Sequence, residues 1–244
     1  FAIGNPRADW MFETEPVPGL NGRSLKYPRG KVIGGSSAIN AMIYMRGQKA
    51  DYDNWRQLGL SGWGWDDVKP FFLKHQDHMT GGEHHGTGGE WRVEHPRMRW
   101  QVLESFAEAA DQASIPHVAD FNTGDNTGVG YFQVNQKEGV RWSSARGFLK
   151  PILKKRPNLK LVTGAFVENV VMHNNRAIGV SWFREKRRDV EHNVSRGANI
   201  ILAAGAVQSP KILEMSGIGQ GERIRALGLP VAHDLQGVGE NLQD

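Results

Sequence analysis

The chain has 244 residues, 39% hydrophobic and 23% charged, which is enough for one large or two modest domains with a core. It contains no cysteine, which excludes disulfides, cysteine-ligated zinc and thiol catalysis. The formal net charge is +4, and basic residues cluster at 154–156 and 184–188 without the interleaved aromatic residues of single-strand nucleic-acid binders. No run approaches the ~18 apolar residues of a membrane-spanning helix.

Residues 1–29 are broken up by prolines and glycines, and this pattern predicts extended coil. A glycine turn follows at Gly34 and Gly35, where the absence of Cβ atoms lets a ligand approach the backbone closely. Ser36 or Ser37 is a suitable N-cap for a following helix.

The largely apolar residues 38–46 predict a buried helix, ended by Gly47. Free N–H groups at the start of such a helix form an anion site, and Asn40 near that end requires a buried partner or a ligand. From the residues alone, a pyrophosphate cradle and a capped core helix after a glycine turn are equally well supported.

Two further helices are predicted at residues 50–58 and 66–75, the second with acidic residues in its first turn and Pro70 close enough to the start to be tolerated. The polar, glycine-rich residues 77–89 predict a loop and a domain boundary. Beyond it, residues 90–94 alternate as a strand does, and residues 101–113 form an amphipathic pattern typical of a helix.

Several histidines gather around this loop: His75, His78, His84, His85 and His95. One interpretation is a metal site, because a His-x-x-His pair and a second pair of histidines are ligands that zinc accepts. The other is a histidine-rich surface loop, which we favour because the nearby carboxylates Asp77, Glu83 and Glu90 follow no fixed ligand spacing. We therefore assign no metal ligand.

The second half of the chain predicts mostly strands. Residues 128–136 alternate, a helix begins at Ser143 and stops near Pro151, and residues 158–162 predict a short strand. Residues 166–172 and 177–183 flank an asparagine-rich turn, which predicts a β-hairpin, and residues 187–194 could pair as a third strand.

The apolar residues 199–204 predict a buried parallel strand that Gly205 ends, with Ser209 and Pro210 opening a helix. Ligands of open α/β sheets bind beyond the carboxyl ends of the strands, which points to Ala204 and Gly205. Tight packing of strand and helix is the alternative, and the glycine turn at residue 34 makes us favour the ligand.

Two long segments resemble the signatures of the glucose–methanol–choline (GMC) flavin oxidoreductases. The first is Tyr27-Pro28-Arg29-Gly30-Lys31-Val32-Ile33-Gly34-Gly35-Ser36-Ser37-Ala38-Ile39-Asn40, continued through Tyr44, Gly47 and Asp53. The second is Gly205-Ala206-Val207-Gln208-Ser209-Pro210-Lys211-Ile212-Leu213-Glu214-Met215-Ser216-Gly217-Ile218-Gly219. The resemblance implies a mixed α/β (α+β) fold, with part of a Rossmann-like FAD-binding domain, its β-meander and part of an α+β substrate domain. We place the FAD-binding domain at residues 1–86 and 157–244 and the substrate domain at residues 87–156.

The resemblance also implies the cofactor, FAD. The residues expected to bind it are Gly34, Gly35, Ser36, Asn40, Ala41, Val167, Ala204 and Gly205. Some relatives attach the flavin through a histidine near the glycine–serine turn, whereas Ile39 and its neighbours here can form no such bond, so non-covalent binding is expected. No catalytic residue is assigned, because the resemblance implies a central piece whose glycine fingerprint precedes Phe1 and whose catalytic histidine follows Asp244.

The resemblance is closest to the choline-dehydrogenase-like branch, and it implies an enzyme that moves hydride from an alcohol carbon to flavin. The alternative is a folded module without catalysis that binds FAD weakly or not at all. The expected partner is a small alcohol, with no nucleic acid, no indicated membrane association and an electron acceptor that the sequence does not identify. The expected location is the cytoplasm or the periphery of the inner membrane face.

Overall fold

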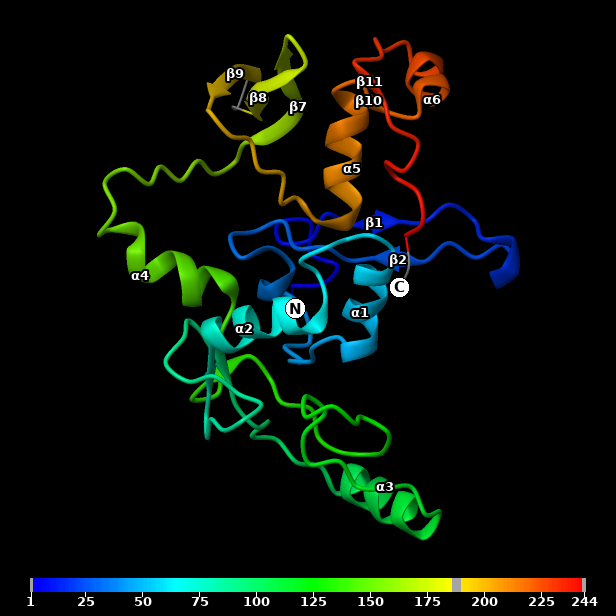
Figure 1. The fold of residues 1–244 in the computed structure, drawn as a ribbon, viewed down its shortest axis with the longest axis vertical. Helices are drawn as coiled ribbons and strands as arrows, with labels where there is room; N and C mark the ends of the chain where they lie inside the picture. Colours follow the sequence, from blue (N-terminus) through cyan, green and yellow to red (C-terminus); the bar gives the residue numbers. More distant parts are fainter. Residues whose placement is uncertain (1, 186–189, 243–244) are drawn as a thin grey trace. The chain divides into compact units, whose positions relative to one another are not determined.

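The computed structural model describes residues 2–185 and 190–242, and it divides into two compact units, Phe1–Leu159 (unit 1) and Lys160–Asp244 (unit 2) (Figure 1). Both units mix short helices with small sheets, as the predicted mixed α/β class requires. A compact unit is not a functional domain, so the predicted domain limits remain a prediction. Among the described residues, no helix has both the length and the apolar character that crossing a membrane requires.

Unit 1 holds three two-stranded sheets and four α-helices. The strands are β1 (Phe12–Glu13), β2 (Lys26–Tyr27), β3 (Gln76–His78), β4 (Trp91–Val93), β5 (Gln136–Lys137) and β6 (Val140–Arg141). The helices are α1 (Lys49–Gln57), α2 (Trp65–His75), α3 (Gln101–Gln112) and α4 (Lys150–Leu153), with 3₁₀ turns at Pro18–Leu20 and Gly35–Ala38 and a π-helical turn at Ala145–Leu149. β1 pairs with β2 and β5 with β6 in antiparallel fashion, whereas β3 and β4 are parallel.

The three helices predicted between residues 50 and 113 are confirmed as α1, α2 and α3. Local hydrogen bonds explain where α1 and α2 begin. The Asp51 carboxylate accepts the Gln48 N–H at 2.7 Å, and the Asp67 carboxylate accepts the Gly64 N–H at 3.0 Å. Each therefore satisfies a backbone donor that the helix itself leaves unpaired.

The buried helix predicted at residues 38–46 is wrong. Only the 3₁₀ turn Gly35–Ala38 is helical, and the chain then runs extended beside residues 133–135. The Tyr44 N–H donates to Gln133 O at 2.8 Å, and the Asn135 N–H donates to Met42 O at 2.7 Å. Tyr44 and Arg46 are buried while the residues between and beside them are exposed, which is the two-residue period of a strand. A largely apolar run of nine residues fits either period, and pairing with a distant segment decided it.

The strand predicted at residues 128–136 is confirmed only in part. Val134 bridges both Ile43 and Glu94, and Val129 bridges His117, but regular pairing begins only at β5. The strand predicted at residues 90–94 is confirmed as β4. Because Val134 joins residue 43 to residue 94, these segments form the centre of unit 1, where Val93 is fully buried.

The favoured interpretation of the histidine-rich stretch as a surface loop is wrong for two of its histidines. β3 begins within it, and His78 and His85 are only 4% and 8% exposed. A Cβ atom on Gly86 would overlap the Leu73 carbonyl of α2, so the loop lies directly against the end of that helix. His78 and His85 therefore belong to an internal hydrogen-bond network, whereas Glu83 and Thr87 of the same loop are exposed.

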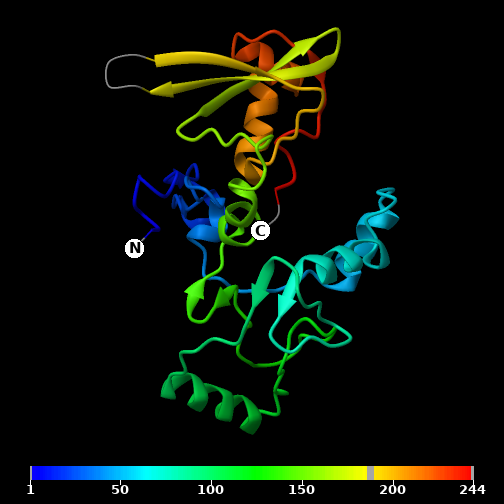
Figure 2. The ribbon, with the colours of Figure 1, turned by 90° about the vertical axis from the view of Figure 1, so that its left-hand side faces the viewer.

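Unit 2 contains a three-stranded antiparallel sheet in the order β7-β8-β9, with α5 packed against it (Figure 2). The strands are β7 (Phe166–His173), β8 (Arg176–Glu185), β9 (Val190–Arg196), β10 (Ile218–Gly219) and β11 (His233–Asp234), and the helices are α5 (Gly205–Met215) and α6 (Gly221–Ala226). The predicted hairpin is confirmed, and Asn174 and Asn175 both have positive φ at its turn. The third strand is confirmed from residue 190 onward, and residues 187–189 of its predicted range lie outside the described part of the chain.

Three local predictions are wrong for unit 2 and the residues just before it. Residues 158–162 and 199–204 form no strand, and Ile201 is 86% exposed. A parallel strand needs a neighbour, and no described strand pairs with residues 199–204. Helix α5 begins at Gly205 and not at Pro210, which lies inside it. Proline then removes one hydrogen bond to the preceding turn, a cost that the packing of the helix on the sheet offsets.

Helix α5 is joined to the sheet by apolar packing and by one side chain. Ile212 and Val170 are each 7% exposed. Ser216, just after α5, accepts the backbone N–H of Val170 at 2.8 Å and donates its own hydroxyl to Ile212 O at 2.5 Å. The hydroxyl therefore satisfies a donor in β7 that is buried from water.

We predict that Ser216→Ala lowers the free energy of unfolding by about 1–2 kcal/mol, because it leaves the Val170 N–H without a partner. Urea denaturation followed by circular dichroism measures this. Ser209→Ala is the matched control, since the Ser209 hydroxyl accepts only the exposed Ala204 N–H, and its cost should be smaller. Equal losses in the two variants would show that Ser216 does not link helix and sheet.

Candidate functional site

The glycine turn of unit 1 has a backbone that only glycine adopts easily. Gly34 and Gly35 have φ angles of 98° and 53°. A Cβ atom on Gly34 would lie 3.2 Å from the Ala145 side chain and 3.4 Å from Ser143 Oγ, so residues 143–145 lie close behind the turn. The turn leads into Gly35–Ala38, where the Ser36 side chain is exposed and accepts the Gly30 N–H at 3.2 Å.

Five of the predicted cofactor residues belong to this turn and the residues that follow it. Gly34 and Gly35 are half-buried, whereas Ser36, Asn40 and Ala41 are exposed. Asn40 was expected to lie in a buried helix, but it lies at the surface and its amide oxygen accepts the Met42 N–H at 3.0 Å. The structure thus gathers the five residues into one exposed turn.

Two residues that the sequence did not single out for the site hold this turn in place. Arg141 Nη1 donates to Ser37 O at 3.2 Å and to Asn40 Oδ1 at 2.9 Å. Ser144 donates its backbone N–H to Ser37 Oγ at 3.0 Å and its hydroxyl to Gly34 O at 3.1 Å. These partners are more than 100 residues away in sequence, and such a pairing leaves no local pattern to read.

The guanidinium of Arg141 has no carboxylate partner among the described residues. Burial lowers its pKa from the usual value, although an arginine remains charged at neutral pH. Its hydrogen bonds go to neutral oxygens only. The glycine turn is therefore accompanied by a half-buried positive charge that no acid of the described chain neutralises.

The other three predicted cofactor residues belong to unit 2. Val167 lies on β7 and lines a cavity of about 250 Å³ between β7, β8 and α5. The other residues lining it are Phe166, Glu168, Phe183, Gln208, Lys211, Ile212 and Met215. Ala204 and Gly205 are exposed at the beginning of α5, where Gly205 has a φ angle of 87°.

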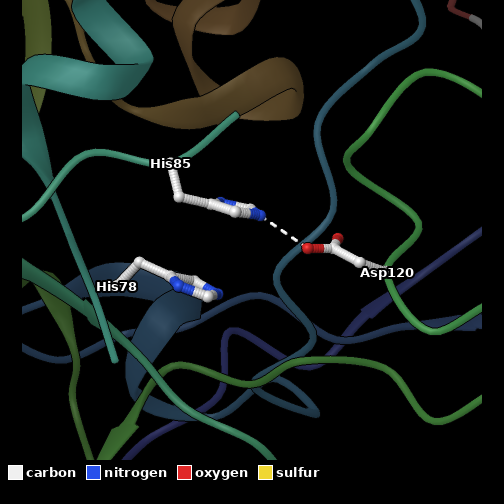
Figure 3. A group of neighbouring side chains, drawn as sticks. All are labelled: His78, His85 and Asp120. Carbon is white, nitrogen blue, oxygen red and sulfur yellow. Dashed lines mark hydrogen bonds and ion pairs between the residues drawn. The ribbon is translucent and has the colours of Figure 1, made fainter. Parts of the chain in front are cut away.

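A second group of polar side chains is buried in unit 1 (Figure 3). His78 and His85 stack with ring centroids 3.9 Å apart, and His85 Nε2 lies 2.5 Å from Asp120 Oδ2. One ligand atom from each of the three residues lies within 4.8 Å of the others, so they could hold a metal ion. The sequence paired these histidines but not Asp120, which follows 35 residues after His85.

The hydrogen bonds of this group disfavour a metal ion. His85 Nδ1 accepts hydrogen bonds from Gln76 Nε2 at 3.0 Å and from Arg46 Nη2 at 3.2 Å, so the ring carries its proton on Nε2 and donates it to Asp120. A metal ion bound to Nε2 of His85 would shift the ring proton to Nδ1. That nitrogen faces the guanidinium of Arg46, so a proton there would point at another donor. The prediction that the chain holds no metal remains a prediction, and these contacts support it.

The pKa values of the group follow from burial and hydrogen bonding. Burial alone would raise the pKa of Asp120, but hydrogen bonds from His85, the Asn122 N–H and Gln133 hold it well below its usual value. Burial, and secondly the neighbouring His85, lower the pKa of His78 from 6.5 to about 4. His78 is therefore neutral at pH 7, and Asp120 is ionised.

We predict that this burial makes the chain less stable in mild acid. Because the unfolded His78 binds a proton near pH 6.5 and the folded one only near pH 4, the free energy of unfolding falls as the pH falls through this window. The free energy of unfolding differs between pH 7 and pH 4.5, and His78→Gln should reduce this difference by about 1–3 kcal/mol. Urea titrations of both proteins at both pH values measure it, and an unchanged difference in the variant would contradict the assignment.

Comparison with known proteins identifies the family. A family model described as GMC oxidoreductase matches residues 11–244. An alcohol dehydrogenase [acceptor] from Pseudomonas putida is 40% identical over 98% of the chain and 43% of its own length. An oxygen-dependent choline dehydrogenase from Sinorhizobium fredii is 42% identical, with the same coverage of 98% and 43%.

Solved structures agree with the sequence comparison. An FAD-dependent oxidoreductase from Chaetomium thermophilum superimposes with a TM-score of 0.89 at 30% identity, covering the whole chain and 45% of that protein. The chain thus spans less than half the length of the relatives that it matches. With a family model matching almost all of it and relatives at about 40% identity, the chain belongs to the GMC oxidoreductase family.

Proposed function

We propose that the chain supplies part of the FAD site of an FAD-dependent alcohol oxidoreductase. The observation that carries this proposal is the glycine turn at Gly34 and Gly35, which has positive φ angles, an exposed Ser36 and an adjacent guanidinium without an acidic partner. Backbone N–H groups and a positive charge around a glycine turn are what the diphosphate of a dinucleotide requires.

The residues of the turn fit a diphosphate in size and charge. Apart from its chain neighbours, no atom lies within 4 Å of where a Cβ of Gly35 would stand, so a phosphate can approach the backbone there, whereas the same position at Gly34 faces Ala145 and Ser143. The Ser36 hydroxyl is exposed, and Asn40 and Ala41 follow at the surface where the flavin would continue. Arg141, held by Ser37 O and Asn40 Oδ1, offers the charge that would compensate the phosphates.

In unit 2, we propose that Val167, Ala204 and Gly205 complete the chain's contribution to the cofactor. Val167 would contact the adenine side through its backbone. Ala204 and Gly205 lie at the N-terminal end of the 11-residue helix α5, which favours negative charge. These three assignments rest on the family resemblance and on the exposure of the helix start.

When bound, FAD supplies the redox chemistry by accepting hydride from the alcohol carbon. The residues of this chain bind and orient the cofactor, and we assign none of them a catalytic proton. Because the chain is similar to alcohol and choline dehydrogenases, we propose that the substrate is a small alcohol and that choline is the first candidate. The proposal names no electron acceptor and involves no nucleic acid. We propose the cytoplasm, or the inner face of a membrane, as its location.

We predict that the chain quenches flavin fluorescence on binding FAD, with a dissociation constant below about 100 μM. Arg141→Gln should weaken binding about tenfold, because it removes a charge-assisted contact and releases Asn40. Arg146→Gln is the matched control, since Arg146 is an exposed arginine five residues away and loses the same charge.

The controls separate the possible results of this titration. Equal weakening by Arg141→Gln and Arg146→Gln would mean that general charge, and not the turn, attracts the cofactor. Absence of quenching by the unsubstituted chain would favour the alternative of a folded module that binds FAD weakly or not at all. Circular dichroism spectra establish that each variant is folded.

We also propose that FAD binds without a covalent bond, because Ile39 is buried beside the turn and residues 34–41 contain no histidine. Acid precipitation of the FAD-loaded chain should therefore leave the flavin in the supernatant, where its absorbance measures the released fraction. Flavin that remains in the protein pellet after washing would contradict non-covalent binding.

A further inference from the structure

A cavity in unit 1 plays no part in the proposed cofactor site. It has a volume of about 220 Å³ and lies between residues 46–49, helix α2, the loop at His84 and the loop at residues 121–124. The residues lining it are Arg46, Gly47, Gln48, Lys49, Trp65, Lys69, His84, Phe121, Asn122, Thr123 and Gly124. None of the residues proposed to bind FAD is among them.

The charge of this cavity is entirely of one sign. Arg46, Lys49 and Lys69 are cationic, and no carboxylate lines the cavity. Within the described part of the chain, none of these three side chains forms an ion pair. Like charges around one hollow repel each other, so the arrangement raises the free energy of the unliganded protein.

Arg46 is the most unusual member, because it is only 6% exposed. Its Nη2 donates to His84 O at 2.6 Å and lies 3.2 Å from His85 Nδ1, and its buried Nε has no hydrogen-bond partner in the described structure. A buried cation is costly unless an anion or several hydrogen bonds compensate it. The nearest acid of this network, Asp120, is separated from Arg46 by the His85 ring.

The environment also fixes where the guanidinium lies. The Arg46 backbone N–H donates to Asn122 Oδ1 at 2.8 Å, and Asn122 Nδ2 donates to Tyr44 O at 3.3 Å. These two contacts fix the Arg46 backbone, and the contacts of Nη2 with His84 O and His85 Nδ1 position the guanidinium. A preorganised cation of this kind can bind an anion without first losing conformational freedom.

We propose that this cavity is a binding site for a small oxyanion of the phosphate class. Its volume lies below the roughly 300–1,000 Å³ of sites for drug-sized ligands, which suits a single phosphate group. Arg46 provides the buried charge, while Lys49 and Lys69 provide charges nearer the opening. Asn122 and Thr123 add polar groups to the wall. The bound anion neutralises a charge that the protein leaves uncompensated.

The test is equilibrium dialysis of the whole chain against radiolabelled inorganic phosphate, with chloride keeping the ionic strength constant. We expect saturable binding of one phosphate per chain, with a dissociation constant of about 1 mM or tighter. Lys69→Gln should weaken binding about fivefold or more, since it removes one of the cavity's charges. Lys74→Gln is the matched control, because Lys74 is exposed on the same helix and does not line the cavity.

Each outcome bears on the proposal. A selective loss in Lys69→Gln, repeated in Lys49→Gln, supports it. Absence of saturable phosphate binding by the unsubstituted chain would overturn it, and so would an equal loss in Lys74→Gln, which would indicate diffuse attraction. Because neither lysine is among the residues proposed for FAD, and none of those residues lines this cavity, flavin binding should be unchanged in these variants. Failure here is therefore distinguishable from failure of the proposed function.

Discussion

The arrangement of unit 1 depends on one chain of hydrogen bonds, from Arg46 through His85 to Asp120. It joins three segments that are distant in sequence: the extended chain after the glycine turn, the loop after α2, and the loop that carries Asp120. Because all three groups are buried or half-buried, each bond acts in a low dielectric where an unsatisfied partner would be costly. The Asp120 carboxylate also accepts hydrogen bonds from Gln133 Nε2 and the Asn122 N–H, which stabilise its charge.

This constraint explains why no helix follows the glycine turn. The extended chain brings Arg46 to His85, and the pairing of Tyr44 with Gln133 satisfies a backbone N–H that a helix would have satisfied internally. The turn Gly35–Ala38 is then held by Arg141 and Ser144, which hydrogen-bond to Ser37. Its exposed face, with Ser36 and Asn40, is consequently left free of regular structure and open to a ligand.

Much of the local structure could be predicted from the sequence, since its causes are local. Helices α1 to α3 follow from periodicity and acidic first turns, and the β7–β8 hairpin follows from its asparagine turn. Residues 38–46 and 199–204 were assigned wrongly, because an apolar run becomes helix, strand or neither according to its partners elsewhere in the chain. The same holds for the site. Gly34 and Ser36 stand in a recognisable motif, whereas Arg141 and Asp120 act through contacts between residues far apart in sequence, and no motif records these.

Four of the described arginines illustrate two ways in which the protein holds a guanidinium. Arg92 pairs with Asp77 and Glu94, and Arg223 pairs with Glu214 and Glu240, so their charges are used within the protein. Arg46 and Arg141 instead donate to carbonyl, amide or imidazole acceptors, which position a guanidinium without neutralising it. Holding a charge in place while leaving it uncompensated costs stability, and the cost is recovered only when an anion binds. The same physical criterion therefore supports the FAD diphosphate beside Arg141 and a separate oxyanion beside Arg46.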